Sequence, residues 1–234
     1  MAQTEEAIIL AGGLGTRLRA VVSDVPKPLA PVAGRPFLAL LLDRLADRGL
    51  KRVILATGHL ADQVEATFGR RWSGMDIVYS VEHAPLGTGG ALRQAISALS
   101  GSAVHVLNGD TWLDFDPFAL ERFAASANKP LAMALAQVQD VSRYGAVEVR
   151  DGLVEAFREK GETGPGWINA GCYFLTADAL CGLPHRNAYS FESDVLRPRA
   201  MSRDVAAFTE TRGFIDIGVP EDYFRAQSLF AARK

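Results

Sequence analysis

Residues 9–32 read ILAGGLGTRLRAVVSDVPKPLAPV and join the end of a short apolar segment to a glycine-rich turn and a Pro-Lys-Pro sequence. Gly13 and Gly15 match the first two glycines of the G-x-G-x-x-G fingerprint of dinucleotide-binding domains, but its third position holds Leu18. The turn nevertheless follows an apolar segment, as ligand-binding loops of α/β domains do. This stretch therefore predicts an α/β fold whose first loop needs a ligand other than a dinucleotide.

Strands and helices are expected to alternate through the first half of the chain. Short apolar runs predict the strands, and apolar residues spaced three and four apart predict the helices. The expected order is strand 7–10, helix 36–50, strand 52–57, helix 60–69, strand 75–82, helix 88–99 and strand 103–110. Such alternation predicts a parallel sheet covered by helices on both faces.

The second half adds antiparallel features to this pattern. A helix from Phe118 and a strand over 131–138 continue the first theme, whereas residues 146–159 alternate inward and outward around Asp151-Gly152. An Asp-Gly pair between alternating segments predicts a β-hairpin. A strand over 168–176 and a closing helix over 218–234 complete the series. Because no repeat or low-complexity linker interrupts the chain, we expect one domain over residues 1–234.

The composition limits the classes of partner. A formal net charge of -2 gives no general attraction to nucleic acid or to an anionic membrane. No apolar run reaches the roughly 18 residues of a membrane span, and the N-terminus lacks the features of a signal peptide, so we expect a cytoplasmic protein. Cys172 and Cys181 form no disulfide framework or zinc motif, and both are expected to be inert core thiols.

Three loops that follow expected strands carry unusual residues. Gly12, Gly13 and Gly15 let backbone N–H groups approach an anion, and Arg17 and Lys27 add positive charge, so this loop favours a polyphosphate. From the residues alone, the glycines could equally serve only to connect a strand to a helix.

The other two loops suggest a base and a metal. Glu82 precedes Gly87, Gly89 and Gly90, whose small size could let a flat ring lie against the backbone. Asp110 directly follows a hydrophobic strand, and Asp216 lies in another short apolar strand. Paired carboxylates suit magnesium shared with phosphate oxygens, although an aspartate after a strand is often only a cap or turn residue. The joint occurrence of the three loops favours a nucleotide site.

These motifs together resemble the signature of the sugar-1-phosphate nucleotidyltransferases. The opening stretch is similar to L-A-G-G-x-G-T-R-L followed by P-K-P-L-x-P-V, and the other motifs follow in the family's order. They are PLGTGGAL at 85–92 for the base, NGD at 108–110 for a metal, EK at 159–160 and NAG at 169–171 for the sugar, and DIGVPEDY at 216–223 for the metal. The resemblance covers nearly the whole chain.

The resemblance implies a Rossmann-like, glycosyltransferase-A-like three-layer α/β fold with a mostly parallel mixed sheet. It also implies a nucleotide-binding half at about residues 1–115 and a sugar-binding half at about 116–234, without the β-helix domain that some family members carry. The implied nucleotide-binding residues are Leu10, Ala11, Gly12, Gly13, Gly15, Thr16, Glu82, Gly87, Thr88 and Asp110. The implied sugar-binding residues are Gly145, Glu159, Lys160 and Asn169, and Asp110 and Asp216 would hold Mg²⁺.

The reaction implied by the resemblance joins a nucleoside triphosphate and a sugar 1-phosphate into a nucleotide sugar and releases pyrophosphate. Arg17 and the glycine-loop amides would hold the leaving pyrophosphate, and Lys27 would neutralise charge between the α-phosphate and the sugar phosphate. Nucleotidyl transfer needs positioning and charge neutralisation but no protein nucleophile, and the sequence offers no recognisable nucleophile.

The finer pattern is most similar to family members that use GTP and D-glycero-α-D-manno-heptose 1-phosphate, which make GDP-heptose for bacterial surface polysaccharides. Uridylyl transfer to N-acetylmuramate 1-phosphate and guanylyl transfer to mannose 1-phosphate are alternatives within the class. A dinucleotide-dependent oxidoreductase and a non-catalytic nucleotide-sugar sensor are alternatives outside it. A homo-oligomer is compatible with the resemblance.

Overall fold

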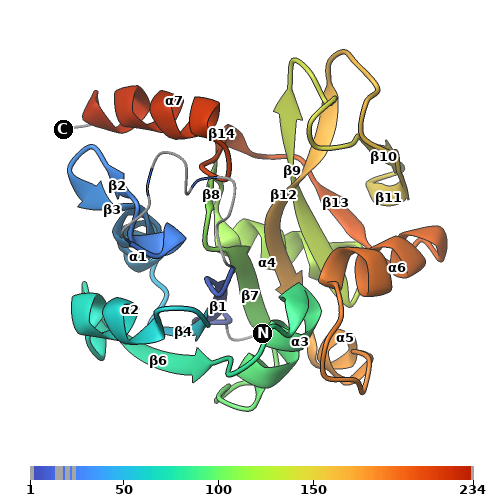
Figure 1. Ribbon diagram of the computed structural model, residues 1–234. Coiled ribbons are helices and arrows are strands. Elements are labelled where there is room, and N and C mark those ends of the chain that lie inside the picture. Colours follow the sequence, from blue (N-terminus) through green and yellow to red (C-terminus); the bar gives the residue numbers. More distant parts are fainter. Residues whose placement is uncertain (1–2, 14–17, 19–21, 23–24, 233–234) are drawn as a thin grey trace.

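The structure is a computed structural model that describes residues 3–13, 18, 22 and 25–232. Its main feature is a ten-stranded sheet with the strand order β10-β11-β13-β9-β12-β7-β1-β4-β6-β5. The strands are β1 (Glu6–Leu10), β4 (Arg52–Thr57), β5 (Arg71–Trp72), β6 (Met75–Val81), β7 (Val104–Asn108), β9 (Leu131–Val138), β10 (Val147–Arg150), β11 (Leu153–Phe157), β12 (Gly166–Leu175) and β13 (Ala206–Phe208). Figure 1 shows this sheet passing between layers of helices.

The helices divide between the two faces of the sheet because successive strand residues point to opposite sides. Ile9 belongs to an apolar cluster that also holds residues of α1, α2, α4 and α7, whereas Ile8 belongs to a second cluster with residues of α3, α5 and α6. The bounds are α1 (Phe37–Asp47), α2 (Ala61–Phe68), α3 (Gly87–Ile96), α4 (Pro117–Ser126), α5 (Ala177–Cys181), α6 (Arg197–Met201) and α7 (Pro220–Ala231). The three-layer α/β architecture expected from the sequence is confirmed.

The sheet is mixed in a definite way. The neighbours β6, β4, β1 and β7 are parallel, and β9 is parallel to β13, but β12 runs antiparallel to both β7 and β9. The predicted hairpin is confirmed as β10 and β11, whose turn residues Asp151 and Gly152 both have positive φ angles of 53° and 72°. Two positive φ angles are what a two-residue hairpin turn of the I′ type requires.

Two short strand pairs and a 3₁₀ turn lie outside this sheet. Strands β8 (Thr111–Asp114) and β14 (Arg212–Asp216) form an antiparallel pair, and β2 (Pro31–Val32) pairs with β3 (Arg35–Pro36). The 3₁₀ turn η1 (Lys27–Leu29) precedes β2. In Figure 1, α7 runs across the top of the molecule next to β14. The end of the chain therefore returns to the loop that follows β7.

The two cysteines differ in environment. Cys172 on β12 is buried, as expected, but Cys181 is exposed. The expectation of a core thiol is wrong for Cys181 because the short helix α5 turns Ala179, and not its last residue, into the apolar cluster. None of the helices in the described part of the chain has the length and apolar character needed to cross a bilayer.

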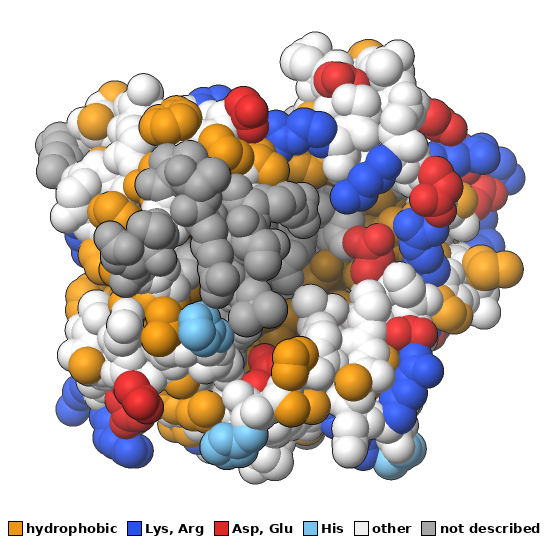
Figure 2. All heavy atoms as spheres, in the orientation of Figure 1, with side chains coloured by type: hydrophobic (Ala, Val, Ile, Leu, Met, Phe, Trp, Pro, Cys, Tyr) orange, Lys and Arg blue, Asp and Glu red, His pale blue; other side chains and the backbone are white. Residues whose placement is uncertain are grey.

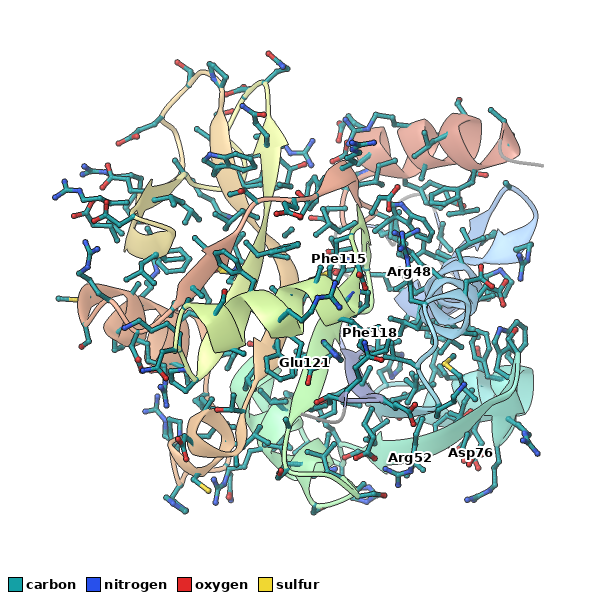
Figure 3. The ribbon with its side chains drawn as sticks, turned by 180° about the vertical axis from the view of Figure 1, so that it is seen from behind. Arg48, Arg52, Asp76, Phe115, Phe118 and Glu121 are labelled. Atoms are coloured by element: carbon teal, nitrogen blue, oxygen red, sulfur yellow. The ribbon has the colours of Figure 1, made fainter. Side chains whose placement is uncertain are left out.

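His105 on β7 is buried in the core and should make the stability depend on pH. Its ring lies edge-on to Phe118 and close to Phe174, and Glu121 approaches from α4. Figure 3 views the molecule from behind and shows Phe118 and Glu121 pointing from α4 toward the strands. Burial lowers the pKa of His105 from 6.5 to about 4. The protonated form is therefore disfavoured in the folded state.

We expect the free energy of unfolding to fall by about 2 kcal/mol between pH 7.5 and pH 5, because the unfolded chain takes up a proton there and the folded chain does not. This contribution is complete above pH 6.5 and is lost as the pH falls toward 4. Urea unfolding at the two pH values measures the effect, with His105→Leu as the comparison. An equal fall in His105→Leu would show that other groups cause it.

Candidate active site

A cavity of about 530 Å³ opens at the carboxyl ends of the parallel strands β1, β4, β6 and β7. This edge is where α/β sheets bind ligands, because the loops that follow neighbouring strands converge there. Seven residues that the sequence analysis assigned to nucleotide binding line the cavity, namely Leu10, Gly12, Gly13, Glu82, Gly87, Thr88 and Asp110. The structure therefore brings the first, second and third predicted loops together around one space.

Glu82 and Gly12 form one wall of this cavity. A Cβ atom added at Gly12 would collide with Oε1 of Glu82, so the glycine is what lets the carboxylate lie on the first loop. The backbone N–H of Leu86 donates to Oε2 of Glu82 over 3.1 Å, which orients the carboxylate. Burial raises the pKa of Glu82 above its usual value. One carboxylate oxygen is thus anchored, and the other faces the first loop and the cavity.

The glycines at the start of α3 have a packing role that the sequence analysis did not foresee. A Cβ at Gly89 would collide with the ring of Tyr189, and one at Gly90 would collide with the carbonyl of Asn187. Gly87 has a φ of +69°, and a Cβ atom added there would lie 2.6 Å from the carbonyl oxygen of Tyr189. Of these three glycines, Gly87 alone lines the cavity, and the other two let α3 pack closely against residues 187–189.

Lys27 and Asp216 lie close to Asp110, which lines the cavity. Asp216 ends β14 and is in register with Thr111, and the N–H of Ile217 donates to the carbonyl of Asp110 over 2.9 Å. Nζ of Lys27 forms an ion pair with Oδ2 of Asp110. A Cβ added at Gly218 would lie 2.7 Å from Oδ1 of Asp216 and 2.9 Å from Nζ of Lys27. The three charged groups therefore share one small space.

The electrostatics of this cluster favour an added cation. Burial raises the pKa of Asp216, and the nearby Asp110 carboxylate raises it further, while Lys27 and the N–H of Gly218 act in the opposite direction. A divalent ion would stabilise both anionic carboxylates. In the described part of the chain, no cluster of three or more His, Cys, Asp or Glu side chains forms a metal site. Two carboxylates, completed by phosphate oxygens of a bound nucleotide, would be a donor set that fits Mg²⁺.

None of the four predicted sugar-binding residues lines the cavity. Asn169 lies on β12, two residues before Gly171. A Cβ atom added at Gly171 would collide with Nδ2 of Asn108, which lines the cavity. Oε1 of Glu159 accepts a hydrogen bond from Arg197 over 2.9 Å.

Gly145 and Lys160 belong to the backbone framework of the same region. Gly145 has a φ of +83°, and an ideal Cβ there would lie 2.7 Å from the carbonyl of Arg158, so the turn needs a glycine. Lys160 forms an isolated backbone bridge with Glu162. Figure 2 shows the hollow in this face of the molecule, with acidic and basic side chains interspersed along its right-hand rim. Charges of both signs therefore border the hollow on that side.

Some assignments lie outside the described residues, and some cavity residues were missed. Gly15, Thr16 and Arg17 are not among the described residues, so their assignments stay predictions. His59 and His83 line the cavity although neither was predicted to bind a ligand, and Asn108, from the NGD motif that the resemblance assigns to a metal, lines it as well. Each of them follows or ends one of the parallel strands, and this position in the sequence could have identified it as a ligand-binding candidate.

The chain belongs to the nucleotidyl transferase family, whose model matches residues 6–233. It is 40% identical over 222 residues to the D-glycero-α-D-manno-heptose 1-phosphate guanylyltransferase of Aneurinibacillus thermoaerophilus, an alignment that covers 95% of this chain and 96% of the relative. It is 35% identical over 228 residues to the mannose-1-phosphate guanylyltransferase of Mycobacterium tuberculosis, with 95% of this chain and 64% of the relative covered.

The solved structure of HddC from Yersinia pseudotuberculosis complexed with GMP-PN has the same fold. The TM-score is 0.83 at 38% sequence identity, and the match covers 96% of this chain and 99% of that one. The family and the fold predicted from the motifs are both confirmed. Membership of this family also removes the dinucleotide-dependent oxidoreductase as an interpretation of the glycine loop.

Proposed function

We propose that the chain transfers a guanylyl group from GTP to D-glycero-α-D-manno-heptose 1-phosphate and releases pyrophosphate. The observation that carries this proposal is one cavity lined by Gly12 and Glu82 and also by Asp110, the residue beside which Lys27 and Asp216 lie. A nucleotide bound in this cavity would place its base beside Glu82 and its reacting phosphate beside Asp110. The guanine and heptose assignments are supported by the relative that is 40% identical and by the similar structure with GMP-PN.

The base would be recognised by Glu82. Guanine presents two donors, N1–H and the 2-amino group, to which a carboxylate can accept hydrogen bonds, whereas uracil offers only one donor on that edge. The N–H of Leu86 holds the carboxylate in place. Gly12 keeps the space beside it open, since any side chain there would displace Glu82.

The phosphates would be held by the first loop and by Lys27. The backbone amides at Gly12 and Gly13 line the cavity and can donate to anionic oxygens, and we assign Gly15, Thr16 and Arg17 to the leaving pyrophosphate on the family motif. Asp110 and Asp216 would hold Mg²⁺, which when bound neutralises phosphate charge. Lys27 adds a fixed positive charge beside both carboxylates.

The transfer itself needs no protein nucleophile. A sugar phosphate oxygen attacks the α-phosphorus, the new P–O bond forms, and the bond to the β-phosphate oxygen breaks so that pyrophosphate leaves. Glu159, Lys160 and Asn169 would hold the sugar phosphate for this attack, and Gly145 would shape the turn beside it. Lys27 stabilises the charge on the transferring phosphate through preorganised electrostatics.

A matrix of nucleotides and sugar phosphates tests this function. GTP, UTP and ATP should each be combined with the 1-phosphates of D-glycero-α-D-manno-heptose, mannose and N-acetylmuramate, with pyrophosphate release as the readout. The proposal predicts the highest kcat/KM for GTP with the heptose. Preference for mannose 1-phosphate would support the second assignment, which the 35% identical relative favours. Absence of transfer with every pair would leave a nucleotide-sugar sensor.

Glu82→Gln should weaken discrimination between guanine and hypoxanthine. The amide keeps one acceptor for the N–H of Leu86 but loses a charged acceptor for the base, so we expect kcat/KM for GTP to fall about 10- to 100-fold. ITP lacks the 2-amino group and should lose less. Glu65→Gln on α2, whose partner is the exposed Arg70, is the matched control. Equal losses with GTP, ITP and UTP would show that Glu82 does not read the base.

A further inference from the structure

Asn169 is held so that only its nitrogen can serve a ligand. Oδ1 accepts hydrogen bonds from the N–H of Gly171 and from the hydroxyl of Tyr173, each over 3.0 Å. Tyr173 is buried, and Asn169 is the last residue of β12 in register with β9 before the register shifts toward Cys172. Two donors occupy the two lone pairs of the amide oxygen. Nδ2 is therefore the group that Asn169 offers at this edge.

Glu192 takes one of the two hydrogens on that nitrogen. Nδ2 of Asn169 donates to Oε2 of Glu192 over 3.3 Å, and within residues 3–13, 18, 22 and 25–232 its second N–H has no acceptor and can serve a ligand. Glu192 begins the π-helix η2 (Glu192–Leu196), a rare conformation that occurs often at functional sites. Its side chain is 46% exposed. A half-exposed carboxylate thus lies beside an amide nitrogen that has one N–H available to a ligand.

Arg197 connects this pair to Glu159. Its Nη1 lies 2.9 Å from Oε1 of Glu159, its Nη2 lies 3.6 Å from Oε1 of Glu192, and its guanidinium stacks over the ring of Phe157 at 5.8 Å. One planar cation therefore links carboxylates from two segments that are distant in the sequence. A guanidinium suits this role because its fork of donors is rigid. The two carboxylates and the one arginine leave acceptor capacity for a ligand rich in hydroxyl groups.

We propose that Glu192 and Arg197 complete the sugar subsite. Asn169 Nδ2 donates to the oxygen of one sugar hydroxyl, and Glu192 accepts the proton of that same hydroxyl. Arg197 is a positioning residue that holds Glu192 and Glu159 at the required separation. The cluster connects to the nucleotide cavity through β12, because Asn169 lies two residues before Gly171, and Gly171 packs against the side chain of the cavity residue Asn108. This inference rests on the proposed function and deepens it by naming the groups that read the sugar.

The test is steady-state kinetics of Glu192→Gln. The substitution keeps the size of the side chain and removes the charged acceptor, so we expect the KM for the sugar phosphate to rise about 10- to 100-fold. The kcat and the KM for GTP should stay within about twofold, as an interaction made equally in ground and transition states requires. The control is Glu155→Gln in the β10–β11 hairpin, which removes the acidic partner of Arg150 and should leave the sugar KM unchanged. An unchanged sugar KM in Glu192→Gln overturns the inference.

Two further measurements distinguish a direct hydrogen bond from Glu192 to a sugar hydroxyl from a purely structural role of this residue. Among monodeoxy analogues of the sugar phosphate, one should have the same kcat/KM with Glu192→Gln as with the wild type, since the hydroxyl that Glu192 reads is already missing. Arg197→Ala should raise the sugar KM, and Arg197→Lys should restore only part of the loss. A uniform loss with every analogue overturns the inference. If the wild-type protein uses no sugar phosphate at all, both the proposed function and this inference are wrong.

Discussion

Asp216→Asn is expected to lower kcat about 100- to 1,000-fold while the protein stays folded, because a preorganised electrostatic contribution to the transition state is lost. Asp216 and Asp110 are the two carboxylates that meet beside Lys27, and Mg²⁺ binds through such a pair together with phosphate oxygens. A neutral amide at either position removes half of the anionic charge that would hold the ion. Asp110→Asn should therefore lose activity to a similar extent.

The two variants should differ in stability, and that difference tests the electrostatic account. Burial and the charge of Asp110 raise the pKa of Asp216, so ionising this side chain costs more free energy in the folded chain than in the unfolded chain. Asp216→Asn removes this cost and keeps an oxygen for the N–H of Gly218, so its Tm should be unchanged or raised. Asp110→Asn loses the ion pair with Lys27, so its Tm should fall.

Pyrophosphate release with varied magnesium and thermal unfolding of the apoprotein provide both readouts. Asp76→Asn, an exposed carboxylate at the start of β6 (Figure 3), is the control and should leave both quantities unchanged. Normal turnover of either site variant in magnesium would show that the metal assignment is wrong. A lower Tm for Asp216→Asn would contradict the stated origin of its raised pKa.

Local patterns were sufficient to predict most of the fold. Apolar runs and helical spacing located the strands and helices, because burial on one or both faces leaves a period that the sequence retains. The antiparallel course of β12 between β7 and β9 could not be predicted in this way. A strand buried on both faces is apolar throughout in either direction, so its composition does not report its orientation.

The candidate site was predictable where chemistry and loop position coincide. Gly12, Glu82 and Asp110 each follow or end a parallel strand, and the fold necessarily brings such positions together. The approach of Asp216 to Asp110 depends on the pairing of β14 with β8, which no local pattern encodes. Glu192 was missed because a glutamate in a polar helical segment is usually a solvated residue. Its contact with Asn169 requires the π-turn, which only the structure shows.

Lys27→Met is expected to lower kcat about 100- to 1,000-fold, because the proposed function places this fixed cation beside the reacting phosphate. Pro26 and Pro28 restrict the backbone on both sides of this lysine, and η1 directs its side chain onto Asp110. The loss should appear mainly in kcat, since the charge on the transferring phosphate is redistributed in the transition state. Lys51→Met, at an exposed lysine before β4, is the matched control.

Lys27→Arg should not restore activity, and this distinguishes a positioned ammonium from a general need for positive charge. Nζ of Lys27 lies so close to Gly218 that a single added methyl group would be 2.9 Å away, whereas a guanidinium is a larger, planar group. Wild-type kcat in Lys27→Arg would mean that charge alone suffices. Lys27→Met should also unfold at a lower temperature near neutral pH, because Asp110 and Asp216 then face each other without the cation that offsets their repulsion.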